Sequence, residues 1–326
     1  MVRLMACHLI LGAGGFVARH VATLLAMRGE SVRLAARSAT PVIDTMLARG
    51  MTAVFGDLRD ADWGALLQGV DVVHHYAWST VPSTADRDPL GDIDGNVRPT
   101  LALLEAMRAR GGGRVLFASS GGTVYGHLRQ IPVSEDQPVE PVSIYGVGKA
   151  TIERYLSVYK NQHNIDARIA RLSNPFGVGQ SLAGNQGAAT LFLHQSMAND
   201  PIHIFGDGSV VRDYVHIADA ADALVALATL ALPPEAPHVF NIGTGVGVSL
   251  NEILIVLERC LDRKINIRRV AGRAYDVPIN VLDVRRARQW LGWSPQLNFE
   301  EGMLRAISDL RIGTGTMSSL NAVRPQ

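Results

Sequence analysis

Short apolar runs alternate with longer amphipathic stretches from Met5 to Ile169. A strand that is followed by a crossover helix pairs with the next strand in parallel, and the helices then cover both faces of the sheet. The chain is therefore predicted to be an α/β protein with a doubly wound parallel sheet, whose ligands gather at the carboxyl ends of the strands. The runs that we interpret as strands are Cys7–Leu11, Val32–Ala35, Ala53–Phe55, Val70–His74, Val115–Ala118 and Ala167–Ala170.

A glycine-rich turn follows the first of these strands. Gly12-Ala13-Gly14-Gly15-Phe16-Val17-Ala18 separates that strand from a helix that is expected to run to about Arg28. Glycines allow a tight turn and let backbone amides approach a pyrophosphate, whose charge the N-terminus of the helix stabilises. An ordinary strand-to-helix turn is the alternative, but the strand before it and the helix after it favour a dinucleotide site of the Rossmann type. Ala18 stands where a third glycine is usual and is small enough for close helix packing.

Two charged residues after the next strands bear on the choice of cofactor. The acidic residue that NAD-binding folds carry about 20 residues after the turn is missing, and Arg37 stands there instead. A guanidinium can pair with a ribose 2′-phosphate through two hydrogen bonds, so NAD and NADP both remain open. Asp57, after the third strand, is placed to accept a hydrogen bond from the adenine amine or to cap a helix, and the two roles are compatible.

Tyr145 and Lys149 stand four residues apart in a stretch, 143–163, that has apolar residues at helical spacing. On a helix, residues at i and i+4 share one face, so the ammonium group can lie beside the phenol. An ammonium there favours the phenolate of a group whose usual pKa is about 10, which makes the tyrosine usable as a base near neutral pH. The spacing alone also fits a solvated helix face, but its position after a dinucleotide turn favours catalysis.

The chain is expected to form two interwoven lobes. Residues 1–173 are predicted to form the dinucleotide-binding domain, which about 217–242 completes. Residues 174–216 and 243–311 are predicted to form a smaller substrate lobe, and Ile312–Gln326 a frayed tail. Glycine and proline breaks mark turns and no long linker, so the lobes share the chain. Further helices are expected at Asn96–Arg110, Ser143–His163 and Ile217–Leu230, and a strand at His238–Ile242.

Composition excludes several classes of partner. Of the 326 residues, 47% are hydrophobic and 19% are charged, and the formal net charge is +1. This argues against disorder and against an electrostatic grip on nucleic acid or acidic membranes, so the partner is expected to be a small molecule. The cysteines Cys7 and Cys260, and the lack of an apolar run approaching about 18 residues, indicate a cytoplasmic protein. No metal site is expected, because His74 and His75 are adjacent on a strand and point to opposite faces.

Further motifs follow in a fixed order along residues 5–311. With the turn, Asp57 and the Tyr145–Lys149 pair, they make the chain resemble the extended short-chain dehydrogenases. More narrowly, it resembles the NAD-dependent epimerase/dehydratase family, the UDP-glucose 4-epimerase-like enzymes. The further motifs are His75-Tyr76-Ala77, Asn96, Ser119-Ser120-Gly121-Gly122-Thr123-Val124-Tyr125-Gly126, Arg171-Leu172-Ser173-Asn174-Pro175, and those at 205–209, 212–216, 241–245 and 291–295.

The resemblance implies roles for individual residues. Tyr145 is implied to be the catalytic base, Lys149 to bind the hydroxyls of the nicotinamide ribose, and Asn174 to contact the sugar nucleotide. Arg212 and Arg273 match the arginines that hold the diphosphate, a role suited to guanidiniums from separate segments. A surface ion pair of Arg212 with the neighbouring Asp213 is the alternative. The implied cofactor contacts are Gly12, Gly15, Phe16, Val17, Arg37, Asp57, Leu58, Tyr76, Ala77, Asn96, Ser119, Tyr145 and Lys149.

One position departs from the family pattern. Gly121 stands where the catalytic serine or threonine of the family is usual. We expect Thr123 to supply the hydroxyl that donates to the sugar oxygen and steadies the tyrosine, with Ser119 or Ser120 as second choice. The related 4,6-dehydratases carry Thr-Asp-Glu in this loop, whereas Gly121-Gly122-Thr123 holds no carboxylate. This argues against dehydration and against sugar-acid decarboxylation.

Three functions are compatible with these motifs. The first is a nucleotide-sugar epimerase, acting at carbon 4 of a UDP-, dTDP- or GDP-hexose, which oxidises the sugar to a 4-keto intermediate and returns the hydride to its other face. The second is an NADPH-dependent reductase of a 4-keto nucleotide sugar, motivated by Arg37. The third is a non-catalytic dinucleotide-binding regulator, suggested by Gly121 and disfavoured by Tyr145 and Lys149. The resemblance also implies a homodimer joined through the two helices expected at 96–110 and 143–163.

Overall fold

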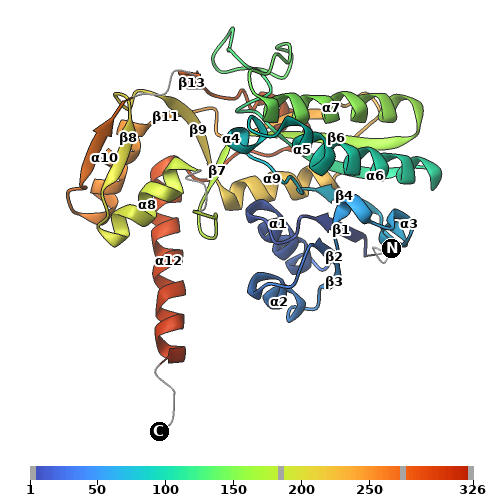
Figure 1. Ribbon diagram of the computed structural model, residues 1–326, viewed down its shortest axis with the longest axis horizontal. Coiled ribbons are helices and arrows are strands. Elements are labelled where there is room, and N and C mark those ends of the chain that lie inside the picture. The colour runs from blue at the N-terminus through green and yellow to red at the C-terminus, as the bar shows by residue number, and fades with distance from the viewer. Residues whose placement is uncertain (1–4, 183–186, 272–276, 322–326) are drawn as a thin grey trace.

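The computed structural model describes residues 5–182, 187–271 and 277–321. Its main feature is a seven-stranded sheet in which all neighbouring strands are parallel, in the order β10-β6-β5-β4-β1-β2-β3. Figure 1 shows the last four of these strands, β4, β1, β2 and β3, side by side. The doubly wound α/β fold predicted from the sequence is therefore confirmed, and every strand predicted for it is present. The strands are β1 (Cys7–Leu11), β2 (Ser31–Ala36), β3 (Thr52–Phe55), β4 (Val72–His75), β5 (Gly113–Ser120), β6 (Ile165–Leu172) and β10 (Val239–Ile242).

Helices cover both faces of this sheet, and each face has its own apolar core. Ile10 of β1 belongs to the core that includes α1 and α9, whereas Leu9 and Leu11 belong to the core that includes α6 and α7. All three side chains are fully buried, as expected for a parallel sheet covered on both sides. The helices are α1 (Phe16–Met27), α2 (Pro41–Leu47), α3 (Trp63–Leu67), α6 (Arg98–Ala109), α7 (Ile144–Gln162), α9 (Ile217–Thr229) and α11 (Arg285–Leu291).

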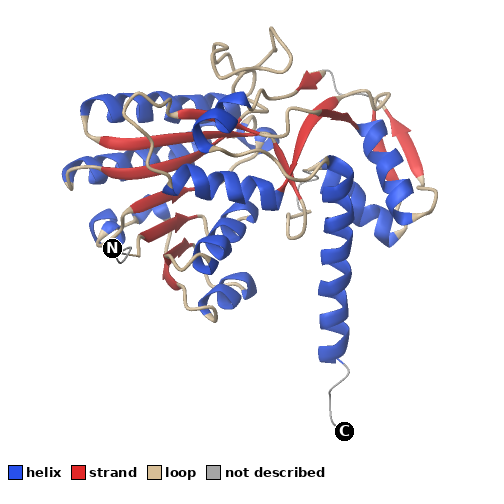
Figure 2. Cartoon of the chain, turned by 180° about the vertical axis from the view of Figure 1, so that it is seen from behind, coloured by secondary structure: helices blue, strands red, loops and turns tan. Residues whose placement is uncertain are grey.

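A smaller group of strands and helices lies beside the main sheet (Figure 2). Its central strand is β9, which pairs in parallel with β7 and β13 and antiparallel with β11, while β8 and β12 form a separate parallel pair. The chain leaves the main sheet after β6 and returns to it at β10, so the two parts are interwoven. The elements are β7 (Asn174–Phe176), α8 (Ala188–Ala198), β8 (Ile202–Phe205), β9 (Val211–His216), β11 (Gly247–Ser249), α10 (Leu250–Leu261), β12 (Ile267–Val270) and β13 (Ile279–Asn280).

Short turns connect β4 to α6. α4 (Pro82–Ala85) and α5 (Pro89–Asp92) lead into a π-helical turn, Ile93–Val97, before α6 begins. Pro99 at the start of α6 lacks a backbone N–H and clashes with a regular helical turn before it, which accounts for the wider turn. The regular helix predicted from Asn96 therefore starts later, and Asn96 itself lies in the π turn.

The last helix, α12 (Phe299–Asn321), continues well beyond the point predicted for the end of the fold. Residues 312–321, which were predicted to begin a frayed tail, continue this helix, and the helix projects away from the rest of the molecule (Figure 1). Met303 and Ala306 anchor its first turns in the core of the smaller lobe, and an anchored helix extends at little cost per residue. Neither α12 nor any other helix in the described ranges is apolar enough over the length needed to cross a membrane.

Candidate active site

The glycine-rich turn joins β1 to α1 at the carboxyl edge of the main sheet. Gly12 has a φ of +77°, and a Cβ built on it would lie 2.7 Å from the Cα of Ala77. A side chain is therefore excluded both by the left-handed backbone and by the close approach of the loop after β4. Gly15 precedes Phe16 and Val17 in the first turn of α1 and places no side chain over the amides of this helix N-terminus. These features suit a diphosphate bound against the turn.

Asp57 lies after β3 and caps a short 3₁₀ turn that begins at Leu58. The carboxylate of Asp57 accepts a hydrogen bond from the backbone N–H of Arg59 at 2.9 Å and pairs with the guanidinium of Arg59 at 2.7 Å. These hydrogen bonds, with a smaller contribution from the charge of Arg37, lower the pKa of Asp57 to about 2. The predicted capping role is thus confirmed, and the contact with adenine stays a prediction. Arg37 is exposed just beyond the end of β2.

Tyr145 and Lys149 lie in the first two turns of α7. The side-chain oxygen of Ser143 caps this helix by accepting a hydrogen bond from the N–H of Gly146 at 3.2 Å. Lys149 is buried, and its ammonium donates to the carbonyl of Ala118 on β5 at 2.8 Å. The Nζ of Lys149 also lies 5.7 Å from the centre of the Tyr145 ring, so the helix and the predicted neighbourhood of the two side chains are confirmed.

Aromatic rings surround the ammonium of Lys149. Its Nζ lies 3.9 Å from the centre of the Trp78 ring and 4.8 Å from that of Phe117. Trp78 also packs edge-to-face on Tyr145, with ring centres 6.0 Å apart. The face of an aromatic ring attracts a cation, while its bulk excludes water. Packing by Trp78 therefore holds both polar side chains in a dry environment.

Burial dominates the acid–base behaviour of this pair. It raises the pKa of Tyr145 to about 12, and the negative charge of Asp92 acts in the same direction. It lowers the pKa of Lys149 to about 7, opposed by the charges of Asp92 and Glu153. In the protein side chains by themselves, the pKa of Tyr145 is therefore above its usual value and not below it as predicted, because burial disfavours the phenolate. A further positive charge is needed before Tyr145 can act as a base near neutral pH.

Leu282 explains the missing hydroxyl at position 121. A Cβ built on Gly121 would lie 2.6 Å from Cδ1 of Leu282, so a serine there would displace the leucine. The Oγ1 of Thr123 is buried and has no hydrogen-bond partner within the described ranges. A buried hydroxyl without a partner costs about 1–3 kcal/mol, which a bound sugar oxygen would offset. Ser119, a second choice for this role, donates its hydroxyl to Glu153 instead.

The side chains of Tyr76 and Asn96 form hydrogen bonds within the protein. The hydroxyl of Tyr76 is hydrogen-bonded to Nδ1 of His74 at 3.0 Å, and Nε2 of His74 lies 2.9 Å from Nδ1 of His8. Asn96 is buried, and its amide nitrogen donates to Asp92 at 2.9 Å. A cofactor contact at Tyr76 would therefore involve its backbone or ring. Within the described ranges, no three His, Cys, Asp or Glu side chains are grouped so that they could hold a metal ion.

The predicted substrate residues come from the smaller lobe. Asn174 begins β7, and its side-chain amide donates to the backbone carbonyl of Asp213 at 3.0 Å. Arg212 lies on β9, opposite Asn280 of β13, and donates to the carbonyl of the preceding residue at 2.8 Å. Asp213 is fully buried and accepts a hydrogen bond from the N–H of Thr244 at 2.8 Å, so the surface ion pair considered for Arg212 is wrong. Arg273 lies outside the described residues.

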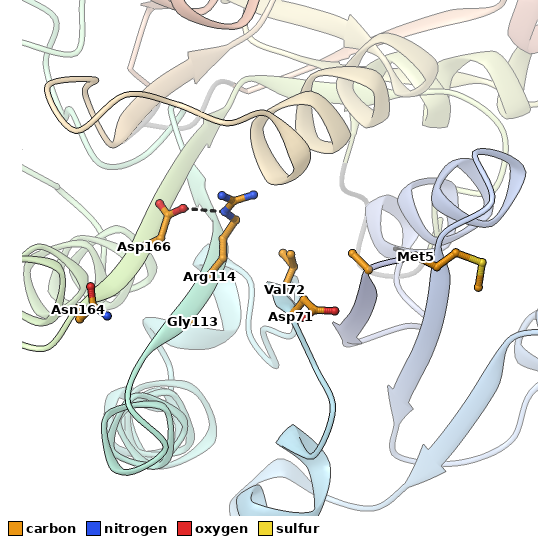
Figure 3. Close-up of a pocket in the computed structure, with 8 residues that line it drawn as sticks. Met5, Asp71, Val72, Gly113, Arg114, Asn164 and Asp166 are labelled. Atoms are coloured by element: carbon orange, nitrogen blue, oxygen red, sulfur yellow. Dashed lines mark hydrogen bonds and ion pairs between the residues drawn. The ribbon is translucent and has the colours of Figure 1, made fainter. Parts of the chain in front are cut away.

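A hollow of about 540 Å³ opens at the opposite edge of the main sheet (Figure 3). Strands β4 and β5 begin at its walls, so it lies at the amino ends of the strands, and Arg114 and Asp166 form an ion pair there at 2.7 Å. Ligands of doubly wound sheets bind at the carboxyl ends, so the hollow is not part of the candidate active site. It is lined by Met5, Ala6, Asp71, Val72, Gly113, Arg114, Asn164 and Asp166.

Sequence reasoning missed Asp92 altogether. Asp92 is 1% exposed, and its charge acts on both Tyr145 and Lys149. The available signal is its spacing: Asp92 stands four residues before Asn96, which places both on one face of a helical segment. Trp78, in the loop after β4, also contacts both members of the catalytic pair.

Comparison with known proteins identifies the family. Residues 8–243 match the NAD dependent epimerase/dehydratase family. The chain belongs to this family. It is 33% identical to a UDP-glucose 4-epimerase from Mycolicibacterium smegmatis, over 93% of this chain and 98% of that protein. It is 31% identical to a dTDP-4-dehydro-6-deoxyglucose reductase from Escherichia coli, over 74% of this chain and 75% of that protein.

The fold of this epimerase/dehydratase family member is shared with solved structures. The crystal structure of Thermus thermophilus UDP-glucose 4-epimerase in complex with NAD superimposes with a TM-score of 0.85. The match covers 94% of this chain and 99% of that chain at 27% identity. The family membership inferred from the ordered motifs is therefore confirmed.

Proposed function

We propose that the protein is a nucleotide-sugar epimerase that acts at carbon 4, with NAD as cofactor and a UDP-hexose as substrate. The proposal rests on the loop after β4, which contacts both the glycine-rich turn and the catalytic pair. Ala77 lies against Gly12, and the next residue, Trp78, contacts Tyr145 and Lys149. A dinucleotide on the turn would thus lie beside the phenol. The M. smegmatis relative and the NAD complex of the T. thermophilus enzyme support the choice of sugar nucleotide and cofactor.

The residues present fit a dinucleotide. The cradle at Gly12 admits no side chain, and the N-terminus of α1 offers backbone amides to a diphosphate. The carboxylate of Asp57, at the turn after β3, would accept a hydrogen bond from the adenine amine. The ammonium of Lys149 uses one hydrogen bond on Ala118 and has further N–H donors for the ribose hydroxyls.

Tyr145 is the group that moves the proton. NAD, when bound, supplies the hydride acceptor and donor and, in its oxidised form, a positive charge. Tyr145 takes the proton of the sugar hydroxyl during oxidation and returns it at the end of the cycle. Its pKa must first fall from about 12 toward neutrality, at about 1.4 kcal/mol per unit. Because a nearby positive charge favours a phenolate, Tyr145 becomes a base only in the loaded site.

The remaining side chains orient the sugar nucleotide. Thr123 would donate its unpartnered hydroxyl to the sugar oxygen, and Asn174 would contact the nucleotide portion. Arg212 and Arg273 are proposed to hold the diphosphate. The hexose has to turn over between oxidation and reduction, so most of the binding energy has to come from the diphosphate and the base, which do not react.

We further propose a homodimer that forms through α6 and α7. Apolar side chains grouped on an exposed face indicate an interface, and α7 and the segment before α6 carry such a group. These exposed apolar side chains are Leu90, Ile93, Val147, Tyr155 and Val158. A monomeric mass in sedimentation at micromolar concentration would contradict this assembly.

The free thiols Cys7 and Cys260 support a reducing compartment, for which we propose the cytoplasm.

Interconversion of nucleotide hexoses without added cofactor tests the epimerase directly. UDP-glucose, dTDP-glucose and GDP-mannose are incubated separately with the purified protein, and the products are identified by NMR. We expect a 4-epimer from at least one of them, and a loss of at least about a thousandfold in rate in Tyr145→Phe. Tyr155→Phe, which removes a phenol hydroxyl from the same helix and keeps the apolar ring, is the matched control and keeps the wild-type rate. Folded protein that yields no epimer from any of the three contradicts the proposal.

A reductase is the second candidate, and two observations favour it. The E. coli relative is a dTDP-4-dehydro-6-deoxyglucose reductase, and Arg37 is exposed where a ribose 2′-phosphate would bind. Stoichiometric oxidation of NADPH by a dTDP-4-keto-6-deoxyhexose would support this candidate. The result against it is turnover of a nucleotide hexose with no net change in NADPH absorbance.

A further inference from the structure

Asp92 is a buried carboxylate at the end of α5. It is 1% exposed, and its Oδ1 accepts hydrogen bonds from Nδ2 of Asn96 at 2.9 Å and from the hydroxyl of Thr80. Both of these donors are neutral. A buried carboxylate is costly unless other groups stabilise its charge, so the position of its second oxygen matters.

The second oxygen of Asp92 lies against α7. A Cβ built on Gly148 would lie 2.6 Å from Oδ2 of Asp92 and 3.1 Å from the ring of Trp78. Gly148 directly precedes Lys149 and stands three residues after Tyr145. The absence of a side chain at position 148 therefore lets the carboxylate reach the helix face between the two catalytic groups.

The other charged and titratable groups around α7 are ion-paired, neutral, or hydrogen-bonded to other positions of the helix. Glu153, on the same helix, forms an ion pair with Arg171 of β6 at 2.7 Å. His75 of β4 is kept neutral, because burial lowers its pKa to about 3. Asp86, at the end of α4, accepts a hydrogen bond from the N–H of Ile144. Glu105 of α6 lies farther along α7, where Tyr159 donates to it.

We propose that Asp92 is a positioning residue: its carboxylate lies against the face of α7 between Tyr145 and Lys149, compensates the ammonium of Lys149 inside a dry site, and holds the amide of Asn96. Asp92 is neither the base nor a direct partner of the sugar. Without its charge, Lys149 would lose its proton at a lower pH and would no longer present a cation and donors at the site. This inference rests on the proposed function for its role in turnover, but not for its effect on Lys149.

The charge of Asp92 acts on the two catalytic groups in the same direction. It raises the pKa of Lys149, because it favours the ammonium, and it raises the pKa of Tyr145, because it disfavours the phenolate. Removing the charge should therefore move both ionisations to lower pH. An opposite charge within about 4–6 Å shifts a neighbouring pKa by roughly one unit or more.

Asp92→Asn tests the proposal, because it removes the charge and keeps the shape. The matched control is Asp94→Asn, which removes an exposed carboxylate, paired with Arg98, from the adjoining turn. The first readout uses no substrate: the protein without cofactor is acylated with acetic anhydride across a pH series, and the peptide that contains Lys149 is quantified by mass spectrometry. We expect the apparent pKa of Lys149 to fall by about one unit in Asp92→Asn and to stay unchanged in Asp94→Asn.

The second readout is the pH dependence of kcat. Both limbs of the profile should move to lower pH by roughly one unit in Asp92→Asn, and neither should move in Asp94→Asn. If Asp92→Asn is not folded, Asp92→Ser is used in its place, since a hydroxyl also accepts the hydrogen bonds of Thr80 and Asn96.

A purely structural role gives a different result. It lowers kcat at every pH while both limbs and the labelling pKa of Lys149 stay in place, and that outcome overturns the proposal. Failure of the epimerase proposal is recognised separately, because wild-type protein would then show no turnover while the labelling experiment still reports on Asp92.

Discussion

The structure predicts the effect of Gly12→Ala in the most detail, because Gly29, at the other end of α1, offers a matched control. Gly12 and Gly29 stand before and after α1 with φ values of +77° and +78°. A Cβ on Gly12 would lie 2.7 Å from the Cα of Ala77 and 2.8 Å from its nitrogen, whereas a Cβ on Gly29 would meet nothing within 4 Å. The two substitutions therefore share the backbone penalty and differ in the collision.

The magnitudes follow from these two contributions. An alanine in the left-handed region costs about 1–2 kcal/mol, so Gly29→Ala should lower the free energy of unfolding by that amount. At Gly12, forcing an atom into a packed backbone adds about 1–3 kcal/mol, and the turn must move away from Ala77. A displaced turn misaligns the amides that would hold the diphosphate. We expect at least tenfold weaker NAD binding, which corresponds to about 1.4 kcal/mol.

The assay is urea unfolding together with calorimetric titration of each variant with NAD. Gly29→Ala should bind NAD as the wild type does, and Gly12→Ala should be both the less stable and the weaker binder. If Gly12→Ala matched Gly29→Ala in stability and the wild type in NAD affinity, the close approach of Ala77 would not shape the cofactor site, and this reasoning would be refuted.

Three further predictions follow from the site. Thr123→Val should lower kcat about a hundredfold with little change in KM, because a hydroxyl that donates only in the reacting complex is lost, and Ser120→Ala should leave kcat near wild type. Burial lowers the pKa of His75 to about 3, so only the unfolded chain gains this proton below about pH 6.5. As the pH falls from 6 to 4, this group should therefore lower the free energy of unfolding by about 1.4 kcal/mol per pH unit, and the loss should be smaller in His75→Gln. If urea unfolding showed the same loss of stability between pH 6 and pH 4 in both proteins, the assignment would be contradicted. Arg37→Ala should weaken NADPH binding and leave NADH binding unchanged, and equal effects on both would remove Arg37 from the ribose site.

Most of the main sheet could be predicted from local patterns in the sequence. Strands such as Cys7–Leu11 and helices such as Ser143–His163 follow from apolar periodicity and capping residues within one stretch of sequence. Ser143 caps α7 with its own side chain, and position 12 favours glycine because its φ of +77° lies in the left-handed region. Features of this kind depend on neighbours in the chain, so a sequence can reveal them.

Other features depend on pairs that are far apart in the sequence. Leu282 fills the space beside Gly121, and no local pattern predicts that contact. The approach of Asp92 to α7 requires the π turn before Pro99 and the bare backbone at Gly148 at the same time. The pKa of Tyr145 was predicted with the wrong sign, because spacing reveals the nearby lysine but not the extent to which packing removes water.

The central claim is that hydride leaves carbon 4 of the sugar and returns to the same carbon while Tyr145 moves the hydroxyl proton. Incubating the protein with UDP-glucose deuterated at carbon 4, and following the product by NMR and mass spectrometry, tests it most directly. The account predicts UDP-galactose that keeps its deuterium at carbon 4, and no such product from Tyr145→Phe. Epimerisation with loss of the deuterium to solvent, or at an undiminished rate in Tyr145→Phe, would contradict it.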